Sequence, residues 1–338
     1  MATIHDVARR AGVSISTVSR VLNENPRVRA ETRRKVLAAI EHLGYVPNAS
    51  ARSLILGRSR VVALFVPDIG NPFYARLAKG VQDVCDASEV SVLICSTDRD
   101  AAKERRVCER LMRQAIDGIC FVRYLVEDET LREVFRTKLP VVVIGAKPDD
   151  LPVDSVGVFG TGAALRTLLE PVVRRGRRRL AFLAGAGDSI VSRARTRIYH
   201  ECVAQLRLDD DPRLIVQAEM TFEGGYAATA GLIRSGVDFD AVFALNDLMA
   251  AGAVQALKAH GRRVPEDVAV VGCDDVEIAA IVEPPLSTLR LPAYELGAQG
   301  AELLLARAKD PGAPVRERAL EVRAIERAST PSYALRQE

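Results

Sequence analysis

Apolar positions in the first 45 residues recur at helical spacing and divide this stretch into three short segments. Ile4–Ala11 places apolar side chains at i, i+3, i+4 and i+7, which predicts an amphipathic helix. Gly12 ends this pattern, and Ser14 is a good N-cap for a second helix over Ile15–Asn23. A third helix is predicted over about Ala30–Leu43. Two short helices joined by a tight turn containing glycine predict a helix-turn-helix.

From residue 60 onward the pattern changes to short apolar runs that alternate with helical stretches. This alternation predicts parallel, doubly wound sheets, and its restart after residue 160 predicts two α/β lobes. In such lobes a ligand binds at the carboxyl ends of the strands or in the cleft between the lobes. The predicted strands are Val61–Val66, Val90–Cys95, Gly118–Phe121, Val141–Ile144, Leu180–Leu183, Leu214–Val216, Ala241–Leu245 and Val268–Val271.

The charge is distributed unevenly between these two regions. The first 60 residues carry eleven Lys and Arg against four Asp and Glu, a net charge of +7, so the remainder carries −4 of the overall +3. A small polyanion-binding head on a mildly acidic body explains this asymmetry, although a well-solvated basic surface would also produce it. In the second helix Ser16, Ser19, Arg20 and Asn23 share the outward face with Ile15. Arg20 suits a guanine edge in the major groove.

Composition and motifs exclude several other classes of protein. Apolar residues make up 48% and charged residues 27%, which is typical of a folded globular chain. There is no apolar run of membrane-spanning length and no secretory signal, so a cytoplasmic protein without membrane contact is expected. The six cysteines form no CxxC pair and are expected as buried thiols. Walker, GxSxG and HExxH motifs are absent, so we expect no enzyme, cofactor or metal.

The run D-V-A-x-x-A-G-V-S-x-x-T-V-S-R-V-L-N, within an ungapped match of about 55 residues, closely resembles the headpiece of the LacI family of bacterial transcription regulators. The resemblance continues over nearly the whole chain. It implies that Ile15, Ser16 and Arg20 read bases, although Ile15 could instead fill a gap between helices. The full set of DNA-binding residues that it implies is Ile4, His5, Ser14, Ile15, Ser16, Ser19, Arg20, Asn23, Arg27, Arg29, Thr32, Tyr45, Asn48, Ala51, Arg52 and Leu54.

The resemblance also implies the domain organisation. An all-α helix-turn-helix headpiece (1–46) is followed by a hinge (47–58) and an α/β body similar to periplasmic binding proteins (59–338). The first lobe would comprise about 59–159 and 290–319, and the second about 160–289 and 320–338. In the family the hinge becomes a helix on operator DNA, where a leucine, here Leu54, wedges into the minor groove.

Residues that follow the strands of the body are candidates for a ligand site, and by resemblance for an effector site. Carboxylate, amide, guanidinium and aromatic groups together suit a hydroxyl-rich molecule, so a sugar or sugar derivative is expected. The candidates are Asp68, Asn71, Phe73, Tyr74, Arg193, Arg195, Met220, Asn246, Asp247 and Asp274. Phe159-Gly160 and Met220 depart from relatives and alter the chemistry of the pocket. The run Gly176-Arg177-Arg178-Arg179 is expected on the surface.

These observations predict a transcription regulator, most often a repressor in this family, that binds a palindromic operator as a homodimer under the control of a small effector. The tail beyond Glu326 carries one leucine, Leu335, and cannot form a coiled coil, so the dimer interface is expected on the lobes. The alternative is a sugar-binding protein without a DNA function. The basic headpiece argues against that alternative.

Overall fold

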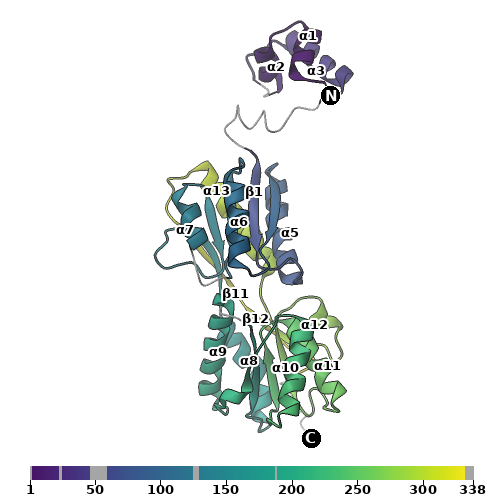
Figure 1. Cartoon of the computed structure of the whole chain (residues 1–338), viewed down its shortest axis with the longest axis vertical. Coiled ribbons are helices and arrows are strands. Elements are labelled where there is room, and N and C mark those ends of the chain that lie inside the picture. The colour runs from purple at the N-terminus through teal and green to yellow at the C-terminus, as the bar shows by residue number, and fades with distance from the viewer. Residues whose placement is uncertain (1, 23–24, 46–58, 125–128, 187–188, 332–338) are drawn as a thin grey trace. The chain divides into compact units, whose positions relative to one another are not determined.

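The computed structural model describes residues 2–22, 25–45, 59–124, 129–186 and 189–331. Its contacts divide the chain into two compact units, Met1–Ser59 and Arg60–Glu338. The first unit is helical and the second is α/β (Figure 1). Within the described ranges no helix is long and apolar enough to cross a membrane.

The headpiece consists of three helices, α1 (Ile4–Ala11), α2 (Ile15–Leu22) and α3 (Ala30–Leu43), as the periodicity predicts. Thr3 caps α1 in a capping box with Asp6, and Gly12 ends the helix in the left-handed conformation at φ 65°. Val7, Val18 and Val36, one from each helix, are fully buried and form the centre of the headpiece core. The predicted helix-turn-helix is therefore confirmed.

The first lobe contains a six-stranded sheet in the order β11-β5-β4-β3-β1-β2, and all of its pairings are parallel. Helices α5 (Pro72–Asp86) and α13 (Ala293–Lys309) bury one face of this sheet, while α6 (Ala101–Met112) and α7 (Glu129–Arg136) bury the other. The strands are β1 (Val61–Val66), β2 (Ser91–Ser96), β3 (Gly118–Val122), β4 (Val141–Ile144), β5 (Asp154–Phe159) and β11 (Glu317–Glu321).

The second lobe contains a six-stranded sheet in the order β12-β10-β9-β8-β6-β7, in which only β12 runs antiparallel to its neighbour. Its strands are β6 (Leu180–Gly185), β7 (Ile215–Ala218), β8 (Ala241–Ala244), β9 (Ala269–Asp274), β10 (Ser287–Arg290) and β12 (Arg323–Ile325). Its helices are α8 (Thr161–Arg174), α9 (Ile190–Leu206), α10 (Phe222–Arg234), α11 (Asp247–Ala259) and α12 (Ile278–Ile281), with a 3₁₀ turn, η1, at Pro212–Leu214. Two doubly wound lobes are thus confirmed.

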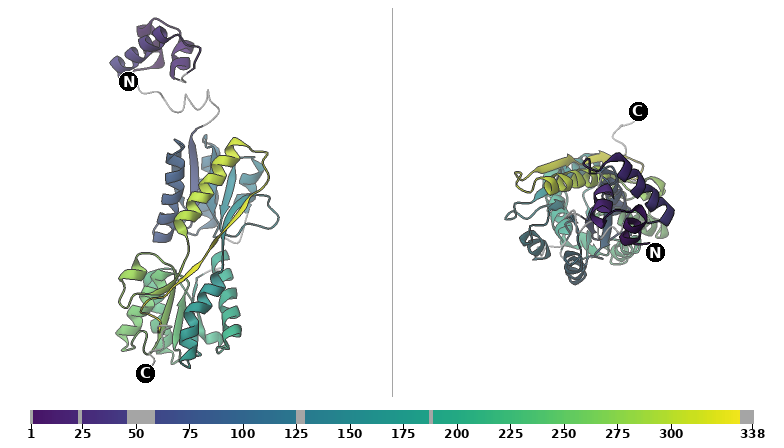
Figure 2. Two further views of the ribbon diagram at one scale, coloured as in Figure 1. Left: turned by 180° about the vertical axis from the view of Figure 1, so that it is seen from behind. Right: turned by 90° about the horizontal axis from the view of Figure 1, so that it is seen from above.

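The chain passes between the two lobes three times. It crosses from β5 to α8 at Gly160, from β10 to α13 at Leu291-Pro292, and from β11 to β12 at Val322. Figure 2 shows the last of these segments, in yellow, running from one lobe into the other. Two of the three crossings touch each other, because the Val322 amide donates a hydrogen bond to the Phe159 carbonyl at 3.0 Å.

The six cysteines are all free and buried, in agreement with the expectation from their apolar surroundings. Burial raises the pKa of the Cys85 and Cys202 thiols to about 11, which keeps both protonated at neutral pH. These thiols behave as small apolar core residues.

Candidate functional site

The outward face of α2 presents the residues that the sequence assigns to base reading. Ser14, Ile15, Ser16 and Arg20 are exposed, while Val18 and Val21 are buried beneath them. The side chain of Ile15 is 41% exposed and therefore does not fill a gap between helices. Ser14 caps the helix, because its hydroxyl accepts a hydrogen bond from the Thr17 amide at 3.2 Å.

A hollow beside α2 gathers three arginines of the headpiece. Its lining includes Arg20 from α2 and Arg27 and Arg29 from the turn before α3, together with Thr17, Asn25, Val28 and Thr32. Asn25 shapes this turn: its side-chain oxygen accepts from the Arg27 amide at 2.9 Å, and its carbonyl accepts from Arg33 at 2.9 Å. Sequence reasoning missed Asn25, although it stands between two predicted helices and directly before Pro26. Three guanidinium groups around one hollow suit a phosphate backbone.

The remaining headpiece candidates occupy different positions. His5 is exposed on α1, whereas Ile4 and Tyr45 are half-buried and pack against the headpiece core. Ser19 is half-buried on α2. Asn23, Asn48, Ala51, Arg52 and Leu54, and with them the predicted hinge, lie outside the described residues.

In the body, three candidate residues from both lobes meet at one point, which we call the effector cleft. Asp274 ends β9, Arg195 lies on α9, and Asn71 begins α5 of the first lobe. One terminal nitrogen of Arg195 lies 3.5 Å from Oδ1 of Asp274, and the other donates to the Leu245 carbonyl. The side-chain amide of Asn71 bonds to the Asp274 carboxylate. Asn71 is held in place as the N-cap of α5, because its Oδ1 accepts from the Phe73 amide at 2.9 Å.

The charged side chains of the cleft are buried, and this burial determines their electrostatics. Arg195 is 9% exposed and Asp274 is 8% exposed. Burial raises the pKa of Asp274 to about 6, even though Arg195 and Asn71 stabilise its ionised form. Burial and the nearby Asp274 carboxylate also hold the pKa of Tyr74 well above its ordinary value. A buried acid next to a guanidinium is a strong acceptor site for ligand hydroxyl groups.

Tyr74 of the first lobe lies near this pair of charges, and Phe73 packs against Tyr74. Phe73 and Tyr74 contact each other edge to face, with ring centroids 5.2 Å apart. Tyr124, which sequence reasoning missed, follows β3 and joins the apolar core of the second lobe, where its carbonyl accepts from the Ile190 amide at 3.0 Å. Its place after the carboxyl end of a predicted strand was the signal that could have found it.

Two further candidates lie next to each other in the second lobe. Asn246 caps α11 by accepting from the Met249 amide at 2.8 Å, and its side-chain nitrogen donates to the Met220 carbonyl at 3.1 Å. Met220 is 7% exposed and packs over Gly185, where an added Cβ would lie 3.1 Å from the Met220 sulfur. The side chain of Asn246 therefore has its oxygen and nitrogen engaged by protein groups.

Three of the candidate side chains do not face a ligand beside Arg195 and Asp274, because they are bound or directed elsewhere. Asp247 is fully buried in the second lobe, where its two oxygens accept from the Val276 amide (2.8 Å) and the Thr288 hydroxyl (2.6 Å). Asp68 forms an ion pair with Arg99 at 2.6 Å. Arg193 lies two residues from Arg195 on α9, so it projects from another side of the helix and lines a surface hollow with Arg197 and His200.

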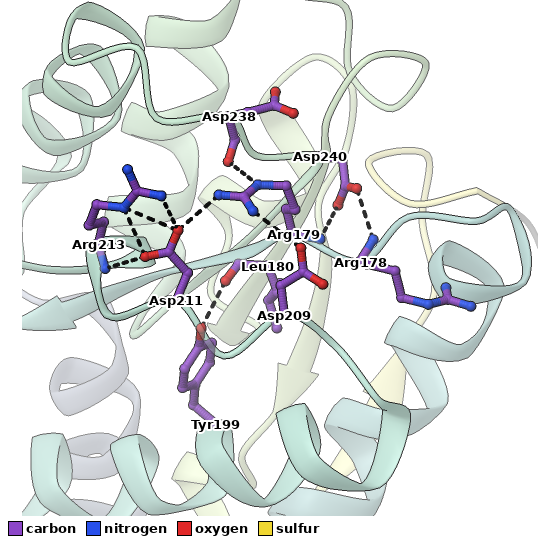
Figure 3. Close-up of polar contacts among 9 residues, drawn as sticks. All are labelled: Arg178, Arg179, Leu180, Tyr199, Asp209, Asp211, Arg213, Asp238 and Asp240. Carbon is purple, nitrogen blue, oxygen red and sulfur yellow. Dashed lines mark hydrogen bonds and ion pairs between the residues drawn. The ribbon is translucent and has the colours of Figure 1, made fainter.

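The run Gly176-Arg177-Arg178-Arg179 lies at the opposite, amino-terminal end of the second sheet. Figure 3 shows that Asp240 accepts from the backbone amides of Arg178 and Arg179, at 2.9 and 3.0 Å. The guanidinium of Arg179 bonds to Asp211 (3.0 Å), Asp209 (3.2 Å) and the Asp238 carbonyl (2.7 Å). The run thus joins three loops of the second lobe and is far from the effector cleft along its strand.

Comparison with known proteins agrees with this architecture. Residues 3–48 match the family model of bacterial regulatory proteins of the lacI family, and residues 169–330 match the periplasmic binding protein-like domain. Catabolite control protein A of Priestia megaterium is 32% identical over 303 residues, covering 89% of this chain and 91% of that protein.

Two solved structures extend the similarity to three dimensions. A transcriptional regulator CelR–cellobiose complex is 31% identical with a TM-score of 0.72, covering 97% of this chain and 100% of that one. The lac repressor dimer bound to operator and the anti-inducer ONPF is 27% identical with a TM-score of 0.87, covering 98% of this chain and 99% of that one. The chain therefore belongs to the LacI family of bacterial transcription regulators.

Proposed function

We propose that this regulator binds a palindromic operator as a homodimer and that a sugar or sugar derivative in the effector cleft controls that binding. The observation that carries the DNA half is the exposed face of α2 beside the arginine-lined hollow. Ile15, Ser16 and Arg20 would contact base edges, while Arg27, Arg29 and Thr32 would contact phosphates. Two copies on one dyad would select a palindromic site.

The observation that carries the effector half is the buried contact of Arg195 with Asp274, which Asn71 of the other lobe reaches as well. A carboxylate accepts from sugar hydroxyls and a guanidinium donates to them, so adjacent hydroxyls satisfy both groups at once. Phe73 and Tyr74 would cover the apolar face of the sugar ring. The cellobiose complex of a regulator 31% identical to this chain supports the choice of ligand class.

The proposed dimer uses apolar side chains that the body leaves exposed. Leu93 and Ile94 are 41% and 42% exposed on β2, an edge strand of the first sheet, and Ile281 is 68% exposed on α12 of the second lobe. Exposed apolar groups on an edge strand are typical of a surface that another chain covers. Binding to chromosomal operators would place the protein on the nucleoid, in the cytoplasm.

One pair of experiments tests both halves. Selection of random duplexes by the full-length protein should recover a palindrome, and a thermal-shift screen of pentoses, hexoses, disaccharides, nucleosides and amino acids should show stabilisation by sugars. Recovery of no preferred sequence would favour a sugar-binding protein without a DNA function. Stabilisation by nucleosides alone would overturn the sugar assignment, since Met220 would then contact a flat base.

A further inference from the structure

Asp275 directly follows the carboxylate of the effector cleft, and its own side chain is clamped between two arginines. The Nε of Arg290 lies 2.5 Å from one Asp275 oxygen, and a terminal nitrogen of Arg327 lies 2.6 Å from the other. The Asp275 side chain is only 7% exposed. Each oxygen of the Asp275 carboxylate therefore accepts a hydrogen bond from a guanidinium, and Asp275 is not expected to bind the ligand itself.

Of the two arginines, Arg290 stands where the chain crosses between the lobes, and Arg327 stands beyond the far end of the strand that follows another crossing. Arg290 is the last residue of β10, immediately before the crossing at Leu291-Pro292. Arg327 follows β12, the strand that begins just after the crossing at Val322, and its second terminal nitrogen donates to the Leu286 carbonyl at 2.8 Å. The clamp thus fastens the end of β9 to the crossing at Leu291-Pro292 and, through Arg327, to the end of β12 that lies away from the crossing at Val322.

The turn that carries Asp274 is one that non-glycine residues rarely adopt. Asp274 has φ 111° and Asp275 has φ 58°, so two consecutive residues with side chains occupy the left-handed half of backbone space. Such a conformation persists only where the surroundings hold it. Within this turn the holding contacts are the Val276 amide on Asp247 and the Asp275 carboxylate between its arginines.

We infer that Asp275 is a positioning residue of the effector site, which holds the Asp274 carboxylate toward Arg195 and Asn71 and ties it, through Arg290, to the crossing at Leu291-Pro292. A ligand that shifts the Asp274 carboxylate would therefore also shift Asp275. Through Arg290, that movement would reach the crossing at Leu291-Pro292, which helps to set how the two lobes are arranged. This inference rests on the proposed function of the cleft. Asp275 itself touches no ligand and acts through its neighbour.

The test compares Asp275→Asn with Asp267→Asn in the full-length protein. Asp267 precedes β9 at its other end and forms a similar two-point pair with Arg263, at 2.6 and 3.0 Å, so its substitution is a matched control for loss of an Arg–Asp pair. Hydrogen exchange is measured without ligand. Asp275→Asn should accelerate exchange at least about tenfold at the Val276 amide and in the β10–β12 ladder. Asp267→Asn should leave both unchanged.

The second measurement uses cellobiose and ribose as probes by calorimetry, together with operator binding in the absence of sugar. Asp275→Asn should weaken binding of whichever sugar the wild type binds by at least about tenfold at a temperature where the variant is folded, with operator affinity retained. Wild-type sugar affinity in Asp275→Asn, or unchanged exchange at Val276, would overturn the inference. If the wild type binds neither sugar, the proposal that the effector is a sugar loses support. The hydrogen-exchange result at the Val276 amide still shows whether Asp275 holds the turn in place.

Arg290→Gln provides a second variant that keeps the experiment decisive if Asp275→Asn does not fold. Arg290 is 52% exposed in its side chain, so its replacement removes half of the clamp and little of the core. The same segments should exchange faster, by a smaller factor than in Asp275→Asn. Exchange at Val276 equal to wild type in Arg290→Gln would contradict the coupling to the crossing at Leu291-Pro292.

Discussion

Arg195 approaches Asp274 without closing an optimal ion pair. The nitrogen and oxygen are 3.5 Å apart, whereas charge-assisted contacts of this type are usually about 2.7–2.9 Å long. The guanidinium is held at that distance because its other terminal nitrogen donates to the Leu245 carbonyl. A ligand hydroxyl group can therefore bond to both charges without first breaking a short contact between them.

Asp274→Asn should abolish the response of operator binding to the effector and leave operator affinity itself within about twofold. Asparagine keeps the size of the side chain but removes the charge that accepts hydroxyl hydrogens, which is worth about 1.5–3 kcal/mol per bond. Fluorescence anisotropy of labelled operator with and without sugar measures both quantities. Asp68→Asn is the control, since its partner is Arg99, and a full response in Asp274→Asn would show that the site is misplaced.

Effector affinity should fall as the pH is lowered through about 6, because protonated Asp274 loses its charge and half of its acceptor capacity. One proton is involved, so the fall is at most about tenfold per pH unit. Titration calorimetry between about pH 5 and pH 8 checks this, and a flat profile would contradict it.

The free energy of unfolding should show the opposite trend from the same carboxyl group. Its pKa in the folded state lies above the unfolded value of 3.8, so the folded state binds the proton more tightly. The resulting stabilisation is present at low pH and is lost as the pH rises through 6. Urea unfolding of the wild type and Asp274→Asn at several pH values measures this contribution together with that of Asp247, whose pKa burial and the Asp274 charge raise to about 8.

Arg20→Ala should relax base preference at one symmetric position of each half-site by about 1–3 kcal/mol. Arg27→Ala, from the same hollow, should instead weaken binding evenly across sequences and reduce its salt dependence. Selection of duplexes followed by affinity measurements at two salt concentrations separates the two effects. An even loss across sequences in Arg20→Ala would make it a phosphate contact.

Asp240→Ala should destabilise the second lobe by about 1–3 kcal/mol, because the amides of Arg178 and Arg179 lose their acceptor. Operator and effector binding should persist at temperatures where the variant is folded. Asp209→Asn, which loses one longer contact with Arg179, serves as the control and should cost less. Equal midpoints of urea unfolding for wild type and Asp240→Ala would contradict a structural role for this network.

Sedimentation should give a species of twice the chain mass of 36.7 kDa. Ile94→Lys should shift it toward the monomer and weaken operator binding, because one headpiece alone contacts half of a palindrome. Leu37→Lys is a matched control, since Leu37 is 50% exposed on the headpiece and outside the proposed interface. A dimer that persists unchanged in Ile94→Lys would place the interface elsewhere.

Most of the strands that could be predicted from the sequence have both faces buried, although the apolar runs of the edge strands β2 and β7 were also recognised. Val61–Val66 and Val141–Ile144 have the predicted bounds, because continuous apolar runs mark buried parallel strands. Strands β5, β10 and β11 escaped prediction: β11 is an exposed edge strand, and β10 buries Ser287 and Thr288, whose hydroxyls bond to other segments. Buried polar strands carry no apolar signal.

In the effector cleft, too, some residues could be predicted from the sequence and others could not. Arg195, Asn71 and Asp274 could be predicted because each follows a strand or begins a helix at the same edge of the sheets. Asp247 looked equivalent in the sequence, yet it points into the lobe and bonds to Thr288 of an unpredicted strand. The Asp275 clamp could not be predicted, because it depends on Arg290 and Arg327, which the fold alone brings beside the turn.

The three crossings also govern the order in which the lobes are completed during synthesis. The first lobe lacks α13 and β11 until the ribosome has added residues 293–321, so the part of one apolar sheet face that α13 covers beside α5 stays open while the entire intervening lobe is made. The second lobe is almost continuous from Thr161 to Arg290 and needs only β12 afterwards. The N-terminal lobe is therefore the one that a nascent chain finishes late, and the one most exposed to chaperones and to aggregation.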